Sequence, residues 1–424
     1  MSQGTRPIYV GDMELSAPAR VGSVAPRTHA RYEQGRILVR LHGMPLGFIE
    51  LSLPDGQVDP ARVRREAYRQ LGGSIDRHLK RDGLPVAEKV PPEAPAERGI
   101  CRDAAETSWH EPLSVVVCSR DRPAQLGMCL TPLRELRYDE FEVVVVDNAP
   151  SDDEPVKQFR NVVGDDPRFR YVMEPRPGLS RARNRGLAEA AFAHVAFTDD
   201  DVLVDPLWLD GVARGFSRDR KAGCVTGLVP SAQLDTPFQR YFDQRVWWSS
   251  RVEPHVYDLI ERTRESRLFP FDAGRIGTGA NFAVDRELME RIGGFDLALG
   301  AGSPTRGGED LDAFVRVLRA GRSIVYEPSA IVWHLHRAVF EELRRQLYGF
   351  GMGLSAYISK YLADPATRWE LLRRIPPAVL HMLSLWGRAE RGNNSSLILA
   401  EARGMMAGPF AYRRARRSAS RDRD

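Results

Sequence analysis

The sequence predicts an α/β fold built on a mainly parallel sheet, with a small N-terminal α+β module and a helical C-terminal region. Two continuous apolar runs, LSVVVC (113–118) and FEVVVVD (141–147), are typical of strands buried on both faces. Further strands are expected at 168–173 and 194–201, and helical stretches separate these runs. Strands that alternate with helices in this way indicate a doubly wound parallel sheet.

The overall composition narrows the class of protein. A chain of 424 residues exceeds one ordinary core, so two or three folded units are expected. Its +4 net charge gives no reason to expect a nucleic-acid partner. The four cysteines form no CxxC motif, which fits a reducing compartment. Without a signal-like leader or a run of about 18 apolar residues, we expect a cytoplasmic protein whose membrane contact is at most peripheral, at the inner face.

Composition also divides the chain into parts. A segment rich in Pro, Ala and Glu begins near Leu84 and is typical of a linker. After Ala338, apolar residues at three- and four-residue steps predict helix, although several glycines interrupt the pattern. The expected parts are an α+β accessory module at 1–90, a linker at 91–112, the main α/β domain at 113–337, and a helical region with a frayed basic tail at 338–424.

Local signals in the N-terminal module predict simple structure. The β-rich runs at 36–42 and 47–53 predict a hairpin. Asp59 followed by Pro60 predicts the start of a helix that runs to about Leu79. Nothing in this module predicts chemistry.

Polar residues gather where the predicted strands end. Ser119 follows the first strand, Asp147 ends the second, and Asp199, Asp200 and Asp201 end the fourth. Ligands of a doubly wound sheet bind at the carboxyl ends of its strands. Three adjacent carboxylates repel one another and need solvent, helix N-termini or a cation as compensation. Their position favours a divalent metal that bridges phosphates over the alternative of solvated cap residues.

Two later motifs add candidates. GGEDLD places Glu309, Asp310 and Asp312 in a first helical turn. The helix dipole alone favours acids there, and the functional alternative is a general base that faces an acceptor hydroxyl. In IVWHLHR, strand alternation places His334 and His336 on one face. An imidazole there is either a metal ligand or a structural residue.

The order of the motifs resembles glycosyltransferase family 2, the inverting family with a GT-A fold. The motifs run from residue 113 to 337 and are SRDR, VVVVDNAPSDD, GLSRARNRGL, FTDDD, GTGANFAV, GGEDLD and VWHLHR. The resemblance implies transfer of a sugar from a nucleotide-diphosphate sugar to an acceptor hydroxyl, with Mn²⁺ or Mg²⁺ as cofactor. It also implies a glycan, lipid-linked or small-molecule acceptor, and the module at 1–90 lies outside it.

The resemblance assigns roles by position. Asp310 corresponds to the catalytic base. Asp199 and Asp201 correspond to the outer acids of the DxD metal motif, although a third acid leaves the register ambiguous. His334 corresponds to a histidine that completes the metal site, with His336 as the alternative. The residues assigned to the nucleotide are Ser119, Arg120, Asp147, Arg183, Asn184, Asp199 and Asp200, of which the first two stand where a Thr-Tyr pair is usual.

Two other function classes stay open. A sugar-phosphate nucleotidyltransferase uses similar sheets and acids, but no Gly-rich basic loop follows the first strand. A non-catalytic carbohydrate-binding protein would keep the fold alone. No GxGxxG follows LSVVVC, which disfavours a dinucleotide-dependent oxidoreductase.

Three segments predict contacts of other kinds. The aromatic run at 244–251 is expected to stack on a sugar or lipid, with core packing as the alternative. The apolar stretch at 375–386 and the arginines of the tail are the expected membrane contacts, with a core helix and a tail that aids solubility as the alternative.

Overall fold

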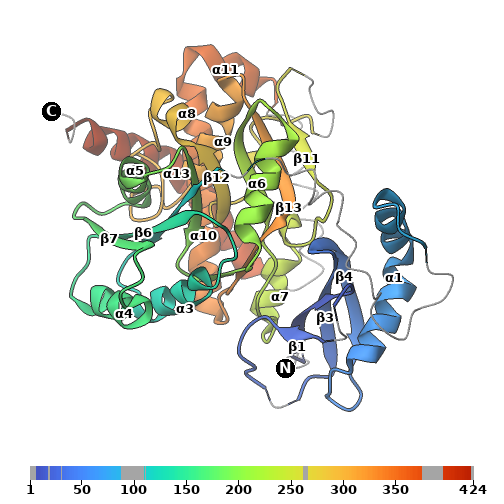
Figure 1. Cartoon of the computed structure of the whole chain (residues 1–424). Helices are drawn as coiled ribbons and strands as arrows, with labels where there is room; N and C mark the ends of the chain where they lie inside the picture. Colours follow the sequence, from blue (N-terminus) through green and yellow to red (C-terminus); the bar gives the residue numbers. More distant parts are fainter. Residues whose placement is uncertain are drawn as a thin grey trace.

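The computed structural model describes residues 6–17, 20–29, 31–86, 109, 111–260, 266–374 and 395–421. A nine-stranded sheet forms the centre of the molecule, and a four-stranded sheet packs beside it (Figure 1). Most of the predicted linker at 91–112 and the whole apolar stretch at 375–386 lie outside the described residues.

Four strands confirm the parallel unit predicted from the apolar runs. They are β5 (Leu113–Ser119), β6 (Phe141–Asn148), β7 (Phe169–Glu174) and β8 (His194–Asp199). They lie parallel to one another in the order β8-β5-β6-β7. After β5 the chain adds β6 and then β7 on one side of it, and the next strand, β8, lies on the opposite side of β5. The carboxyl ends of β5 and β8 therefore flank a topological switch point, where open α/β sheets bind ligands.

The other half of the sheet contains antiparallel pairs, and of its strands the sequence had indicated only the end of β13, in the IVWHLHR motif. The strands are β9 (Val202–Val204), β10 (Ala222–Leu228), β11 (His255–Tyr257), β12 (Asn281–Asp285) and β13 (Ser323–His334). Because β12 lies antiparallel to both β8 and β10, those two strands run the same way. β13 is parallel to β10, while β9 and β11 oppose it. The predicted α/β fold with a mainly parallel sheet is confirmed.

Helices cover both faces of this sheet. They are α3 (Pro123–Arg134), α4 (Glu154–Val163), α5 (Leu179–Glu189), α6 (Trp208–Arg218), α7 (Pro237–Asp243), α8 (Arg286–Arg291), α9 (Glu309–Arg319) and α11 (Pro365–Leu372). Alternate residues of β5 point to opposite faces. Val115 and Val117 pack in a cluster with α3 and α6, and Val116 packs in a second cluster with α5 and α9.

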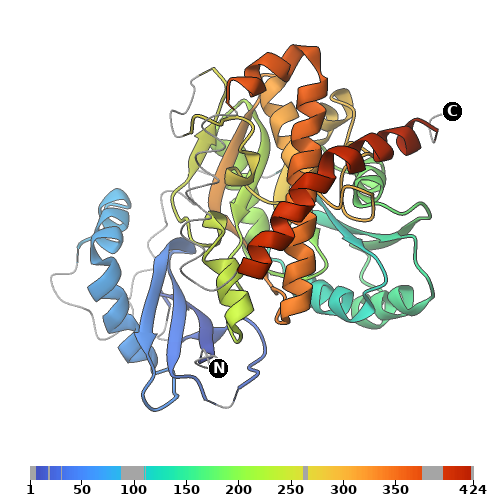
Figure 2. The same cartoon turned by 180° about the vertical axis from the view of Figure 1, so that it is seen from behind.

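The C-terminal region consists mainly of two crossing helices, α10 (Phe340–Ala363) and α13 (Ser395–Arg421) (Figure 2). The glycines do not interrupt α10, which is continuous. Their role is to let the backbones of α10 and α13 approach each other closely. A Cβ on Gly351 would lie 2.1 Å from the carbonyl oxygen of Glu401, and one on Gly404 would lie 2.0 Å from that of Tyr348. The prediction of a frayed tail is wrong for the described residues, because α13 extends to Arg421.

The N-terminal module contains the predicted hairpin and helix and two further strands. Its elements are β1 (Ile8–Glu14), β2 (Gly22–Ser23), β3 (Gln34–Leu41), β4 (Met44–Ser52) and α1 (Pro60–Arg81). Asp59 caps α1 by accepting hydrogen bonds from two backbone amides, as predicted. The buried Arg40 of β3 pairs with Asp12 of the same module and with Asp205, which follows β9. This contact ties the small sheet to the large one, and the boundaries of the four parts stay a prediction.

Candidate active site

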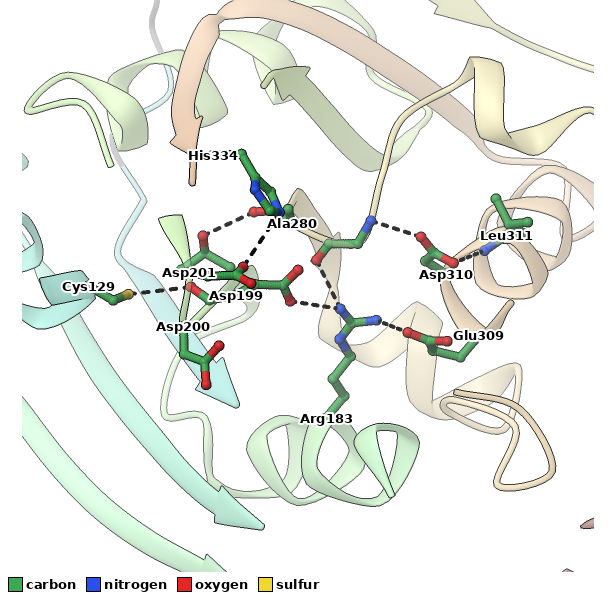
Figure 3. A network of polar contacts seen from close by, with 12 residues as sticks. Cys129, Arg183, Asp199, Asp200, Asp201, Ala280, Glu309, Asp310, Leu311 and His334 are labelled. Atoms are coloured by element: carbon green, nitrogen blue, oxygen red, sulfur yellow. Dashed lines mark hydrogen bonds and ion pairs between the residues drawn. The ribbon is translucent and has the colours of Figure 1, made fainter. Parts of the chain in front are cut away.

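Three side chains of the kinds that bind metal ions lie close together at the carboxyl ends of β8 and β13 (Figure 3). Asp199 ends β8, Asp201 follows it, and His334 ends β13. One ligand atom from each of the three lies within 4.8 Å of the others, and His334 Nε2 is 3.5 Å from Asp201 Oδ1. The antiparallel pairing of β9 with β13 places His334 opposite Val202, directly after the acids. Two carboxylates and an imidazole are donors that fit a divalent metal such as Mn²⁺.

The middle acid is held differently. Ser119 Oγ donates to Asp200 Oδ2 at 2.7 Å, and Arg122 Nη1 donates to Asp200 Oδ1 at 2.9 Å. Asp201 also faces Arg337, whose Nη2 lies 3.1 Å from Oδ2. Protein partners thus occupy both oxygens of Asp200, whereas the two outer acids face the histidine. The structure brings together the outer pair that the family motif would select.

Burial shapes the charge of this cluster. Desolvation raises the pKa of Asp199, the neighbouring charges of Asp201 and Asp200 raise it further, and Arg183 opposes the shift. A bound cation would oppose this rise in the pKa of Asp199, because it favours the ionised carboxylate. Burial lowers the pKa of His334, which favours the neutral imidazole that metals bind.

Arg183 links the acids to the start of α9. Its guanidinium is fully buried, and Nη1 donates to Glu309 Oε1 at 2.9 Å. Nη2 donates to the carbonyl oxygen of Gly279 at 2.9 Å and reaches Asp199 Oδ1 at 3.4 Å. The side chain therefore positions two parts of the site, and its predicted contact with the nucleotide diphosphate stays a prediction.

Asn184, the next residue, faces a loop. Its Nδ2 donates to the carbonyl oxygen of Phe295 at 2.9 Å, and its Oδ1 accepts from the amide of Phe295 at 2.7 Å. Both polar ends of the amide are thus paired with one backbone residue. The structure assigns Asn184 a positioning role here, and its nucleotide contact is likewise untested.

Asp310 lies half-buried in the first turn of α9, near Arg183 (Figure 3). Its Oδ2 accepts from the amide of Gly279 at 2.8 Å, and its Oδ1 accepts from the amide of Leu311 at 2.9 Å. A Cβ at position 279 would lie 2.7 Å from Arg183 Nη2 and 3.2 Å from Asp310 Oδ2. Glycine in the GTGAN motif therefore allows the chain to pass between the arginine and the aspartate.

The two acids beside Asp310 differ from it in their surroundings. Asp312 is fully buried, and it pairs with Lys360 at 2.7 Å, Arg316 at 2.8 Å and the Tyr361 hydroxyl at 3.0 Å. Those partners give it a structural role. Burial and the charge of Asp310 raise the pKa of Glu309, against the opposing effect of Arg183.

A different group lies at the end of β6. Asp147 is buried, and its Oδ2 accepts a hydrogen bond from the Tyr171 hydroxyl. Among the described residues its Oδ1 has no hydrogen-bond partner, and burial raises the pKa of the carboxyl group. An unpaired buried acceptor of this kind suits an N–H donor of a bound nucleotide base. Arg120, predicted nearby, is exposed and lies 3.6 Å from Asp121.

Sequence reasoning assigned no role to several of these partners. Arg122 stands in the SRDR motif, and its spacing after β5 was the only signal that could have found it. Tyr171 gave no signal, because the pairing of β7 with β6 is what brings it to Asp147. Arg337 ends the VWHLHR motif, and only the fold shows that it contacts Asp201.

The aromatic run at 244–251 divides between the two predicted alternatives. Trp248 is buried beside Phe242, with ring centroids 6.2 Å apart. Trp247 instead borders a pocket that Arg251 and Tyr257 also line. Trp248 therefore belongs to the core, whereas Trp247 is half-buried between Tyr326 and the Arg251 guanidinium at the edge of this pocket.

Comparison with known proteins identifies the family. Residues 110–348, more than half of the chain, match the sequence model described as Glycosyltransferase like family 2. The chain belongs to glycosyltransferase family 2. The resemblance inferred from the motifs is thereby confirmed, and the matched region contains the whole acid cluster together with Asp310.

The relatives of this family 2 chain include two bacterial enzymes. A pre-mycofactocin glycosyltransferase of Mycobacterium tuberculosis is 29% identical over 320 residues, which cover 70% of this chain and 62% of the relative. An N-acetylglucosaminyltransferase of Rhizobium leguminosarum is 26% identical over 220 residues, covering 51% of this chain and 49% of the relative. The chain thus spans less than two thirds of the length of these relatives.

Among solved structures, the mannosyltransferase PcManGT from Pyrobaculum calidifontis, in complex with GDP-Man and Mn²⁺, has a TM-score of 0.49 and 16% sequence identity. That similarity covers 82% of this chain and 97% of the other.

Proposed function

We propose that this protein transfers a sugar from a nucleotide-diphosphate sugar to an acceptor hydroxyl, with inversion at the anomeric carbon. The observation that carries the proposal is the meeting of Asp199, Asp201 and His334 at the sheet edge, with Arg183 linking this group to the segment that bears Asp310. Family membership supports the same reaction class.

The chain's own residues have separate roles in this reaction. Asp310 takes the proton of the acceptor hydroxyl, and two backbone amides fix the direction of its carboxylate. The attacking oxygen then displaces the nucleoside diphosphate from the opposite face of the sugar. Asp147 accepts a hydrogen bond from the nucleotide base through Oδ1, which has no partner among the described residues.

Asp199, Asp201 and His334 would hold the divalent metal. When bound, that ion neutralises negative charge on the donor diphosphate as the glycosidic bond breaks. Arg183 helps to orient Asp199, since its Nη2 lies 3.4 Å from Asp199 Oδ1.

A donor screen tests the proposal. The full chain is incubated with UDP-, GDP- and dTDP-sugars in Mn²⁺ or Mg²⁺, and nucleoside diphosphate release is measured with and without glycan acceptors. We expect release with one nucleotide class that depends on the metal. Release of pyrophosphate from a sugar phosphate and a nucleoside triphosphate would instead favour a nucleotidyltransferase. Binding without release would favour a carbohydrate-binding protein.

The two histidines should differ in their effect on the metal. His336 is buried; its ring stacks on that of His334 with centroids 4.5 Å apart, and it lies tilted against that of Phe242 at 4.6 Å. It lies outside the group of three donors. We expect His334→Ala to raise the metal concentration for half-maximal activity more than His336→Ala does. A titration of activity with Mn²⁺ measures both, and the reverse ranking would make His336 the ligand.

A peripheral membrane contact has a candidate surface on α13. Leu399, Met406 and Phe410 are 48%, 67% and 73% exposed, and their spacing places them on one stripe of the helix. The same stripe carries exposed arginines at 403, 413, 414 and 417. No described helix has the length and apolar character needed to cross a bilayer. We propose that this mixed apolar and basic stripe binds an anionic lipid surface, because such surfaces need both signals.

The stripe makes a testable prediction. Phe410→Ser with Arg413→Gln should lower co-sedimentation with anionic vesicles several-fold, since each basic residue near such a surface contributes about 1 kcal/mol. High salt should have the same effect on the unchanged protein. Trp369→Ser is the matched control, because this residue is 69% exposed on α11, outside the stripe. Equal binding to neutral vesicles, or an equal loss with the control, would refute the assignment.

A further inference from the structure

A second set of metal-type donors lies in the N-terminal module, where the sequence predicted no chemistry. His42 sits in the turn between β3 and β4, His78 lies near the end of α1, and Asp82 caps that end. One ligand atom from each of the three lies within 4.8 Å of the others. Their side chains are 5%, 2% and 0% exposed. Three polar groups are thus buried together against one another.

The distances within this group form a nearly equilateral triangle. His42 Nδ1 lies 3.2 Å from His78 Nε2 and 3.0 Å from Asp82 Oδ2, and the last two atoms are 3.1 Å apart. With Asp82 ionised, protons satisfy at most two of these contacts. If His42 Nδ1 and His78 Nε2 both carry hydrogen, these two donors face each other. If only one of them carries hydrogen, the other nitrogen is an acceptor that faces the acceptor Asp82 Oδ2. Ligands of a tetrahedral zinc ion at 2.0–2.1 Å are about 3.3 Å apart, so one cation satisfies all three contacts.

We propose that His42, His78 and Asp82 form a second, structural metal site that takes zinc and ties the β3–β4 turn to the end of α1. Two imidazoles and a carboxylate are zinc ligands, and a zinc site with three protein ligands takes a fourth from solvent or another group. The site is separate from the acids at the edge of the large sheet, and it does not depend on the proposed transfer reaction.

The protein holds the turn in the conformation that this site needs. Glu14 Oε1 accepts from the amide of His42 at 2.9 Å, and Oε2 accepts from the amide of Gly43 at 2.8 Å. His42 has a φ of 54°, a left-handed conformation that costs a non-glycine residue about 1 kcal/mol or more. Arg81 Nη2 lies 3.4 Å from His78 Nδ1, at the outer limit of a hydrogen bond. Zinc on Nε2 leaves the proton on Nδ1, so it requires this guanidinium to turn aside.

The position of the site suggests what the metal would stabilise. All of β4 and most of α1 separate His42 from His78 along the chain, so a shared ion closes a long loop. A Cβ on Gly43 would lie 3.3 Å from Leu207, the residue before α6, so the turn also touches the main domain. Zinc should therefore stabilise the module and the contact through which it meets the large sheet.

The test must separate this site from the one at the sheet edge. The full-length Asp201→Asn variant removes a ligand of the latter, and His42→Asn is then added to it. Asn is chosen because it tolerates the left-handed backbone. His29→Asn is the matched control, since His29 belongs to the same module but not to the triad. Each protein is stripped with a chelator, equilibrated with micromolar Zn²⁺ and desalted. Zinc content and the zinc-dependent melting temperature are then measured.

We expect Asp201→Asn, alone or with His29→Asn, to retain about one zinc ion per chain and to melt at a higher temperature with zinc. Adding His42→Asn should abolish both effects, and Co²⁺ should give a tetrahedral absorption band only while the triad is intact. If Asp201→Asn retains no zinc, or if His42→Asn leaves its zinc content unchanged, the proposal is wrong. Should His42→Asn fail to fold by circular dichroism, the zinc content of Asp201→Asn alone decides.

Discussion

Asp310→Asn is expected to lower the rate of sugar transfer by about two to four orders of magnitude, the usual worth of general acid–base catalysis. Asparagine keeps the shape of the side chain but cannot take a proton. One of the two amide contacts, to Gly279 or Leu311, loses its acceptor oxygen, which is a small local change. Donor binding should therefore survive, and calorimetry with the nucleoside diphosphate measures that binding beside the rate.

The neighbours of Asp310 provide the control. Asp312 is not an alternative base, because Arg316, Lys360 and Tyr361 occupy its carboxylate. Glu309 is the remaining candidate. If Asp310→Asn turns over at a near-normal rate, the base would be Glu309, and Glu309→Gln should then give the large loss.

Asp201→Asn is expected to lower transfer at least about a hundredfold, a loss on the scale of removing one group that stabilises transition-state charge. Asparagine retains one acceptor oxygen for Arg337, so the fold should persist. The variant should also bind donor nucleotide with little response to Mn²⁺. Calorimetry with Mn²⁺ or with EDTA measures this response directly.

Asp200→Asn tests whether the metal ligands of the acid triplet are its two outer acids or include the middle one. Asp200 pairs with Ser119 and Arg122 and lies outside the group of three donors. We expect this variant to bind nucleotide more weakly while keeping its response to Mn²⁺. If Asp200→Asn loses that response and Asp201→Asn keeps it, the middle acid would be the ligand. If EDTA does not alter nucleotide binding by the unchanged protein, the metal assignment itself would be wrong.

Much of the central fold could be predicted because the signal is local. The runs at 113–118 and 141–147 are apolar throughout, as strands covered on both faces must be, and they appear as β5 and β6. The antiparallel strand β12 could not be placed in the same way. Its position between β8 and β10 depends on which distant strands it pairs with, and its own five residues do not specify those partners.

The continuity of α10 and of the C-terminal tail also depends on contacts between distant segments, which the sequence does not show. Glycines at 349, 351 and 353 looked like interruptions, because helix propensity counts only the chain's own backbone. In the structure Gly351 of α10 meets Glu401 of α13, and the absence of a side chain is what permits the contact. The extension of α13 to Arg421 has a related cause, since Tyr412 and Ala415 pack in a small cluster with Ala356 of α10.

By itself the sequence determined the family, the strand ends that carry acids and the residue types available for catalysis. Only the tertiary structure decided how those residues combine. It turned Asp199 and Asp201 toward His334 while pairing Asp200 with Ser119, and it joined His42 to His78 and Asp82 in a module that had shown no chemistry. Strand order and register bring side chains together from distant points of the chain. Hydrophobic periodicity reports which face of an element is buried, and it contains no information about the partner that covers it.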